Sequence, residues 1–327
     1  MKKIFSIIIC LVLILMISLL NIHNKKDEDK SLTKIKVAEV THSVFYAPWY
    51  VAIENNYFKD EGLDIGLILT PGADKVAAAV LSNDVNIGFA GLESTIYVYN
   101  GGEKDYLVNF AGLTKRDGQF ILSRSKNDNF NLEELYGKEV LVGRKGGMPA
   151  LNFLNALKKM NIDSSKINLN YSVEFAALSG SFIGGMGDYV NLFEPTATKL
   201  EKENLGYVVA SIGAYSGEMP YTTYYARKSY IENNMDVITS FSNAIQKGLD
   251  FTHSHSAEEI AKIILDYFPD TSLDDLTKLV DRYKKIDSWY KTTHIDEDSY
   301  NHVLEIIDAA GELKGIAPYD KLIKNVK

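Results

Sequence analysis

Short apolar segments that alternate with polar residues recur from residue 34 to about residue 212, and segments with helical spacing separate them. A period of two is typical of a half-buried strand, and apolar residues at i, i+3 and i+4 are typical of an amphipathic helix. We expect strands at 34–40, 64–69, 85–90, 107–112, 139–143, 167–173, 189–193 and 207–212. We expect helices at 48–60, 73–83, 93–100, 131–136, 149–160, 175–180 and 196–203. This alternation predicts an α/β fold with mainly parallel sheets that helices cover on both faces.

The pattern becomes almost entirely helical after about residue 229. Ser256 and Ser272 each precede acidic residues and an apolar-periodic run, which is the signature of a helix N-cap. The periodic runs in this part of the chain are Met235–Phe251, Ala257–Tyr267, Leu273–Tyr283 and Asp296–Leu313. We therefore expect a helical C-terminal segment.

Two extended, β-prone stretches, Leu113–Ser125 and Glu218–Lys228, interrupt the regular order of elements. If both are crossings, the chain forms two lobes with a hinge and a cleft, which suits closure on a ligand. Lobe I would then be discontinuous and consist of residues 34–114 and 222–327, with residues 115–221 forming lobe II. Each stretch could equally be a strand pair inside one sheet, and the spacing leaves both readings open.

The N-terminus predicts the compartment. Lys2 and Lys3 precede an uncharged apolar run from Ile4 to Ile22, and a polar stretch follows. We expect residues 1–24 to be a signal peptide or a membrane anchor and residues 25–33 to be a charged tether. An uncleaved anchor is favoured because no A-x-A-like cleavage site follows the run. Lys2 and Lys3 would stay inside, which places the rest of the chain at the outer face of the cytoplasmic membrane.

Composition excludes several classes of function. The net charge is −8 and no basic cluster could follow a nucleic acid. Cys10 is the one cysteine, so no internal disulfide can form, and Ile9 before it argues against lipoprotein processing. His253 and His255 have metal-like spacing but lack carboxylate or cysteine partners in the local sequence. We expect no metal and no cofactor.

The stretch Thr41–Asp64 combines a strand end, a polar-aromatic turn and a helix that Pro48 begins. Open α/β sheets bind ligands at this place, beyond the carboxyl end of a strand and beside the first amides of a helix. The alternative is an ordinary loop whose aromatic side chains pack inward. The chain also holds 20 Tyr and 14 Phe, which suit a small-ligand cleft if some of them line one.

Three segments in a fixed order resemble the substrate-binding proteins of ABC importers: 41–64, 72–91 and 137–147. The nearest family serves nitrate, taurine, alkanesulfonates and thiamine-type pyrimidines, and the resemblance covers nearly all of residues 34–313. It implies the type II periplasmic-binding-protein fold, in which two crossing strands join two α/β lobes. It also implies a helical C-terminal segment on the first lobe, a monomer, and a permease with a cytoplasmic ATPase as partner.

The resemblance points to loops of the family's cleft. Glycines permit close approach of a ligand to the backbone, and helix N-termini offer amide donors. Each candidate also has an explanation that needs no ligand. The aromatic side chains could belong to the core, and the hydroxyls could cap a helix. The Glu93 carboxylate is favourable in the first turn of a helix in any case, and the basic corner at Arg144 could simply face water. The candidates are Ser43, Phe45, Tyr46, Gly91, Glu93, Ser94, Thr95, Arg144, Gly146, Gly147 and Met148.

The most distinctive stretch of the second lobe is 180–195, which the family matches with a small-residue turn, a strand and an acidic residue before proline. It adds Ser181, Asp188 and Glu194 as ligand-binding candidates. The carboxylates of Asp188 and Glu194 could accept a hydrogen bond from an amino group or a ring N–H of a ligand. They could equally hold their own loops by hydrogen bonds.

The leading hypothesis is an extracytoplasmic solute-binding component of an ABC importer, with an aliphatic sulfonate or taurine-like anion as the solute, because the segment Arg144–Gly147 offers cations and amides. A thiamine-related pyrimidine is the alternative, and a ligand-sensing surface protein without a transporter is a third reading. The family also includes fungal pyrimidine synthases with iron and a cysteine-rich motif. This chain has one cysteine, so we expect no enzyme.

Overall fold

The computed structural model describes residues 32–326, and the chain from Lys34 onward forms a compact unit of its own. The predicted signal peptide or anchor at 1–24, and most of the predicted tether, lie outside the described residues. Within the described range, no helix has both the length and the apolar character needed to cross a membrane.

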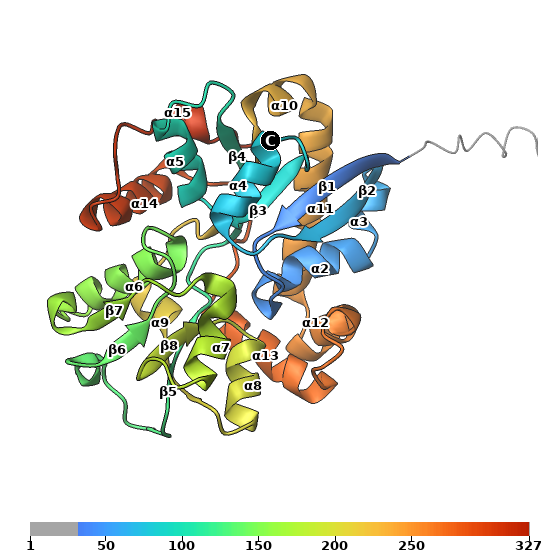
Figure 1. Ribbon diagram of the computed structural model, residues 1–327. Helices are drawn as coiled ribbons and strands as arrows, with labels where there is room; N and C mark the ends of the chain where they lie inside the picture. The colour runs from blue at the N-terminus through green and yellow to red at the C-terminus, as the bar shows by residue number, and fades with distance from the viewer. Residues whose placement is uncertain (1–31, 327) are drawn as a thin grey trace, which may run out of the picture. The chain divides into compact units, whose positions relative to one another are not determined.

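The first sheet has five strands in the order β2-β1-β3-β10-β4 (Figure 1). Its strands are β1 (Thr33–Glu39), β2 (Leu63–Leu69), β3 (Ile87–Gly91), β4 (Leu107–Thr114) and β10 (Thr222–Arg227). β1 and β3 run parallel, whereas β10 runs antiparallel to both β3 and β4. We call this sheet and the helices on it lobe I.

The second sheet also has five strands, in the order β7-β6-β8-β5-β9. Its strands are β5 (Phe120–Ser123), β6 (Glu139–Leu141), β7 (Asn168–Asn170), β8 (Tyr189–Leu192) and β9 (Tyr207–Ser211). β6 pairs in parallel with β7 and β8, and β5 pairs antiparallel with β8 and β9. We call this sheet and its helices lobe II.

The chain passes between the two sheets twice. Residues 115–119 lead from β4 into β5, and residues 212–221 lead from β9 into β10. The strand after each passage, β5 or β10, is inserted antiparallel between two others. The predicted α/β fold with two sheets joined by two crossings is confirmed, and each sheet is mixed because of its inserted strand.

Lobe I carries α2 (Ala47–Glu54), α3 (Tyr57–Asp60), α4 (Ala73–Leu81) and α5 (Glu93–Asn100), with a short 3-10 turn, η1, at Val44–Tyr46. The helix expected at 48–60 is two helices, because Asn56 adopts a left-handed backbone with φ 58° between them. α4 covers one face of the sheet through apolar side chains that contact Ala38, Ala90 and Leu107. Helices of the other face share the main apolar core.

Lobe II carries α6 (Met148–Lys159), α7 (Leu178–Ile183), α8 (Thr196–Lys202) and α9 (Ile212–Ser216). Side chains alternate along its strands, so neighbouring residues join different cores. Ile121 and Val140 belong to the core that includes α6, whereas Leu122 and Val190 belong to the core that includes α7 and α8. Short 3-10 turns are η2 (Leu132–Leu135), η3 (Ser164–Lys166) and η4 (Phe175–Ala177).

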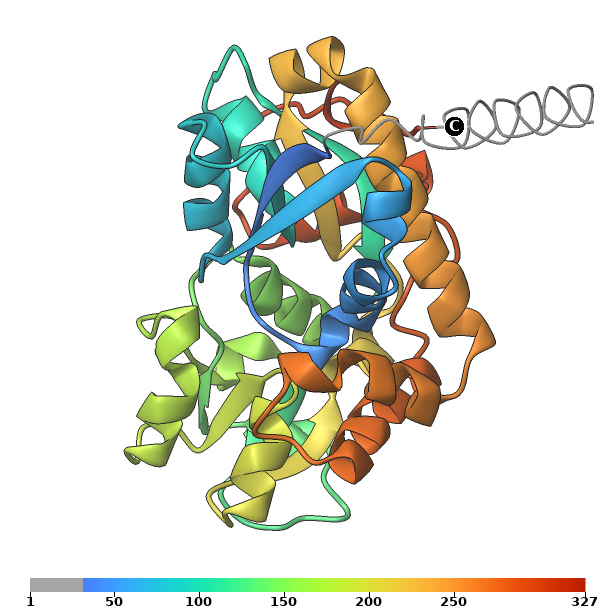
Figure 2. The same cartoon turned by 90° about the vertical axis from the view of Figure 1, so that its right-hand side faces the viewer.

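The helical C-terminal segment contains the four runs that the periodicity predicts. They are α11 (Met235–Ser254), α12 (Ala257–Ile264) with η5 (Leu265–Tyr267), α13 (Leu273–Lys285) and α14 (Glu297–Ala309). The structure adds two short helices, α10 (Lys228–Asn233) and α15 (Tyr319–Leu322), that were not predicted. α11 and α12, drawn in orange, pack against α2 of lobe I (Figure 2). α13 also contacts lobe II, because Arg282 pairs with Glu194 and Asp275 pairs with Lys202.

The close approach of α11 to α2 depends on Gly248. A Cβ at this position would overlap the backbone carbonyl oxygen of Pro48 and lie 3.0 Å from Cβ of Ala52. We therefore expect Gly248→Ala to lower the free energy of unfolding by about 1–3 kcal/mol, as overpacking does in other cores. Urea denaturation of the purified chain measures this value.

Gly180→Ala is the matched control, because Gly180 is also helical and an added Cβ there meets nothing within 4 Å. Alanine has the higher helix propensity, so this variant should gain up to about 1 kcal/mol. Equal effects at the two positions would contradict the packing argument.

Candidate functional site

A cavity of about 250 Å³ lies between lobe I and lobe II. Its walls come from residues just beyond β1, β3, β6, β7 and β8. The carboxyl ends of parallel strands from both sheets therefore face one space, which is the place where α/β sheets bind ligands.

Lobe I and the second crossing contribute residues from four segments of the chain. Val40 and Thr41 follow β1, Tyr46 lies on η1, and residues 71–75 lead into α4. Gly91 and Glu93 stand at the junction of β3 and α5, Tyr221 ends the second crossing, and Thr222 begins β10. Three sequence candidates, Tyr46, Gly91 and Glu93, thus line the cavity.

Lobe II contributes one basic corner and a largely aromatic wall. Arg144 and Gly147 lie between β6 and α6, and Met148 begins α6; these three candidates line the cavity with Gly143 and Pro149. Residues 171–176 and Phe193 complete the wall, with Tyr171 and Phe175 among them.

Glu93 is the most unusual of the lining groups, because its side chain is 1% exposed. Its Oε1 accepts a hydrogen bond from the backbone amide of Met148 at 3.0 Å, across the two lobes. Its Oε2 has no hydrogen-bond partner among the described residues. Burial raises the pKa of this carboxyl to about 7, although the Met148 amide and the Arg144 charge oppose the shift. A Cβ on residue 91 would overlap Oε2, so Gly91 makes this position possible.

Charged pairs between the lobes stand at the same cavity. Lys75 Nζ lies 3.2 Å from Glu174 Oε2, and Arg144 Nε lies 3.9 Å from Asp74 Oδ1. All four side chains are between 45% and 77% exposed, so each pair contributes at most about 1 kcal/mol. Their main effect is to place an acid beside each cation that lines the cavity.

Ser43 and Phe45 are buried where the two lobes meet and do not line the cavity. Ser43 Oγ donates to the backbone oxygen of Glu194 at 2.6 Å. The Phe45 ring lies 5.5 Å from Phe193 and 5.2 Å from Tyr283 between centroids, and Trp289 Nε1 donates to its backbone oxygen at 2.7 Å. Both residues thus support the cavity from behind its walls.

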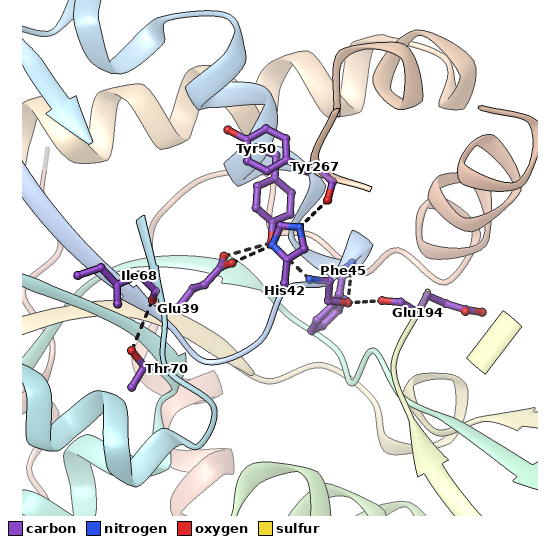
Figure 3. Close-up of polar contacts among 9 residues, drawn as sticks. Glu39, His42, Phe45, Tyr50, Ile68, Thr70, Glu194 and Tyr267 are labelled. Atoms are coloured by element: carbon purple, nitrogen blue, oxygen red, sulfur yellow. Dashed lines mark hydrogen bonds and ion pairs between the residues drawn. The ribbon is translucent and has the colours of Figure 1, made fainter. Parts of the chain in front are cut away.

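His42 fixes the loop before Ser43 to the C-terminal segment (Figure 3). Its Nδ1 lies 3.0 Å from the buried Glu39 carboxylate, and its Nε2 lies 2.8 Å from the backbone oxygen of Tyr267. Burial lowers the pKa of His42, but these two hydrogen bonds outweigh it and raise that pKa overall. Val40 and Thr41 of the cavity wall are held through this contact.

Ser94, Thr95 and Gly146 lie outside the cavity lining, and each makes a hydrogen bond within the protein. Ser94 Oγ donates to the Gly91 oxygen at 2.8 Å, and Thr95 Oγ1 donates to the Leu92 oxygen at 2.9 Å. The backbone oxygen of Gly146 accepts a hydrogen bond from the Tyr97 hydroxyl at 2.8 Å.

The structure places the three candidates from 180–195 outside the cavity lining as well. The Asp188 carboxylate accepts from the backbone amide of Glu139 at 2.8 Å. The buried Glu194 carboxylate accepts from the Thr198 amide at 2.9 Å and pairs with Arg282, while Ser181 lies on α7. Ligand contact by these residues stays a prediction that the cavity does not support.

The amino-acid sequence matches a known family and a named relative. A family model described as NMT1/THI5 like matches residues 44–259. YtlA of Bacillus subtilis (strain 168), which carries the provisional name of a binding protein, is 42% identical over 297 residues, or 90% of this chain and 89% of YtlA. The chain belongs to the NMT1/THI5-like family.

Solved binding proteins share the fold of this NMT1/THI5-like protein. The alkanesulfonate-binding protein SsuA from Xanthomonas axonopodis pv. citri, bound to MOPS, has a TM-score of 0.72 at 12% identity, over 90% of this chain and 99% of that one. The periplasmic aliphatic sulphonate binding protein SsuA from Escherichia coli has a TM-score of 0.69 at 15% identity, and the match covers 90% of this chain and 98% of that one. The periplasmic nitrate-binding protein NrtA from Synechocystis PCC 6803 has a TM-score of 0.59 at 15% identity, and the match covers 75% of this chain and 69% of that one.

Family and fold together support a solute-binding protein of the ABC-import type, and the relatives named above are binding proteins rather than enzymes. At such low identities the solved structures establish the fold, and the ligand has to be argued from the site. Residues 32–326 hold no cluster of three histidine, cysteine or acidic side chains suited to a metal ion.

The sequence analysis did not identify several residues that line the cavity of this NMT1/THI5-like protein. Asp74 and Lys75 could have been identified, because they follow Pro71-Gly72 at a helix start and lie in the segment 72–91 that carries the family resemblance. Tyr171, Phe175 and Phe193 gave no local signal, because aromatic residues near strand ends are usually core. Only the pairing of β6, β7 and β8 brings them to one wall.

Asp117, on the first crossing, is fully buried, and its carboxylate accepts from the Gln119 amide at 2.6 Å and from Asn152 Nδ2 at 2.9 Å. Burial raises its pKa from 3.8 to about 7. The folded protein therefore keeps this proton between roughly pH 4 and 7, where the unfolded chain releases it. The resulting stabilisation is fully present at low pH and is lost as pH rises through this window.

Asp117→Asn removes the titration, so we expect the melting temperature of the variant, relative to that of the unmodified chain, to rise from pH 4 to pH 8. Thermal denaturation across this range checks the sign. Asp163→Asn is the control, because the pKa of that exposed carboxyl is lowered by hydrogen bonds from Ser165 and its difference should stay flat. Parallel profiles for Asp117→Asn and the unmodified chain would contradict the assignment.

Proposed function

We propose that this protein is the extracytoplasmic solute-binding component of an ABC importer, which captures a small solute between its lobes and delivers it to a permease. The observation that carries the proposal is the cavity lined from both lobes at the carboxyl ends of their strands. Family membership and the binding-protein fold support it. A ligand that contacts both lobes favours their closed arrangement over an open one.

The size and walls of the cavity describe the solute. A volume of about 250 Å³ lies below the range of roughly 300–1,000 Å³ that drug-sized ligands occupy, so the solute is a small metabolite. Tyr46, Tyr171, Phe175, Phe193 and Tyr221 offer aromatic surface, which suits a flat ring.

The charges of the site bear on the choice between a sulfonate and a pyrimidine. The sequence favoured a sulfonate because of the amides and cations at 144–147, and the SsuA proteins have the same fold. In this chain the first amide of α6, on Met148, donates to Glu93, while Arg144 and Lys75 each lie near an acid. We therefore favour a thiamine-related pyrimidine, whose amino group can donate to an acidic site.

The remaining parts of the proposal concern location and partners. The apolar run Ile4–Ile22 supports attachment at the outer face of the membrane, and the binding-protein fold supports work as a monomer with permease subunits and a cytoplasmic ATPase. Adjacent permease and ATPase genes would agree with import, whereas their absence would favour a surface sensor.

The test is a thermal-shift screen of the purified full chain with 4-amino-5-hydroxymethyl-2-methylpyrimidine, taurine and an alkanesulfonate, followed by calorimetry. A ligand at a hundred times its dissociation constant adds about 2.7 kcal/mol to the stability, so the pyrimidine should raise the melting temperature by several degrees. A larger shift with taurine would contradict the ligand, and no shift with any of the three would contradict the proposal.

A further inference from the structure

We propose that Glu93 is the specificity-determining residue of the cavity and that it couples recognition of the solute to contact between the lobes. One carboxylate oxygen binds lobe II, and the other is placed to accept a hydrogen bond from an N–H group of the solute. This inference rests on the proposed function, because it requires a solute in the cavity.

The two oxygens of Glu93 have different surroundings. Oε1 accepts from the Met148 amide at 3.0 Å, whereas Oε2 has no partner among the described residues although the side chain is 1% exposed. A buried polar atom without a partner costs about 1–3 kcal/mol, and more when it is charged. Glu93 lines the cavity, so a donor on a bound solute can satisfy this oxygen.

The position of Glu93 is built into the backbone. It is the first residue of α5, and the absence of a side chain on Gly91 leaves space for its carboxylate. One turn later on α5, the Tyr97 hydroxyl donates to the Gly146 oxygen at 2.8 Å. α5 therefore makes two hydrogen bonds of opposite sense to the segment 144–148, and one of them involves Glu93, which lines the cavity.

The other charged groups of the cavity strengthen the selection. Asp74 and Glu174 lie beside Arg144 and Lys75, so the cations already have acidic neighbours and Glu93 is the remaining charge on the wall among the lining residues. In its ionised form, the Glu93 carboxylate would present a like charge to a sulfonate or carboxylate group near Oε2. An amino or ring N–H group would instead form a charge-assisted hydrogen bond.

Glu93→Gln tests the inference, because glutamine keeps the shape and can still accept from Met148 but then presents an amide N–H to the solute. Calorimetry on the purified full chain would use 4-amino-5-hydroxymethyl-2-methylpyrimidine and taurine. We expect the pyrimidine affinity to fall roughly ten- to hundredfold, which corresponds to the loss of a hydrogen bond to a charged group. The affinity for taurine should stay equal or rise, so that the ratio of the two changes.

Tyr97→Phe is the matched control, since it removes the neighbouring bond between the lobes without a change in the cavity lining. This variant should change the affinities for the pyrimidine and for taurine by the same factor. Gly91→Ala gives a second route, because its Cβ would displace Oε2, and it should reproduce the selective loss while the carboxylate stays in the chain.

The possible failures are distinguishable. If the unmodified chain binds the pyrimidine and both Glu93→Gln and Gly91→Ala bind it equally well, the inference is wrong and the proposed function stands. If Glu93→Gln and Tyr97→Phe each lower the affinity for both solutes by the same factor, Glu93 acts only through contact between the lobes. The claim that it selects the solute is then wrong. If the unmodified chain binds neither solute, the proposed ligand and the inference fail together.

Discussion

The packing of Phe45 against Gly118 fixes how the two sheets meet around the cavity. Phe45 belongs to lobe I and Gly118 to the first crossing, and a Cβ on residue 118 would lie 2.5 Å from Cδ2 of the ring. Phe193 and Tyr283 contact the same ring, and buried aromatic pairs of this kind contribute about 0.5–1.5 kcal/mol each beyond their buried area. With this junction in place, Tyr46 and Phe193 stand in the cavity walls beside it.

A second contact between the lobes lies at Glu93 and Met148. Glu93 lies beneath the loop that begins α6, and the contact between the lobes buries its carboxylate. A carboxylate in such a place is costly unless every oxygen has a donor. The protein supplies one donor, from Met148, and the proposed solute would supply the other. Under this proposal, Glu93 links recognition of the solute to one of the contacts between the lobes.

The fold and the ligand are separate questions in this family. The SsuA and NrtA proteins share the architecture at identities of 12–15%, and a likeness at this level leaves the site chemistry open. Open α/β sheets generally bind ligands beyond the carboxyl ends of their strands. The side chains on the loops then decide the ligand, and here the basic corner at 144–147 lies opposite acids of lobe I.

The sequence by itself determined the order of strands and helices, the helical C-terminal segment and the loops at the strand ends, because these follow from local periodicity and capping. It identified Tyr46, Gly91, Glu93 and the corner at 144–148 through the resemblance of these loops to the family's cleft, and glycine, proline and helix-start signals supported that match. Only the tertiary structure showed that Phe45 is buried in the core and that Phe175 and Phe193 line the cavity. It also showed that the first amide of α6, on Met148, donates its hydrogen bond to Glu93. Burial and pairing between lobes depend on contacts far apart in the chain, which no local pattern records.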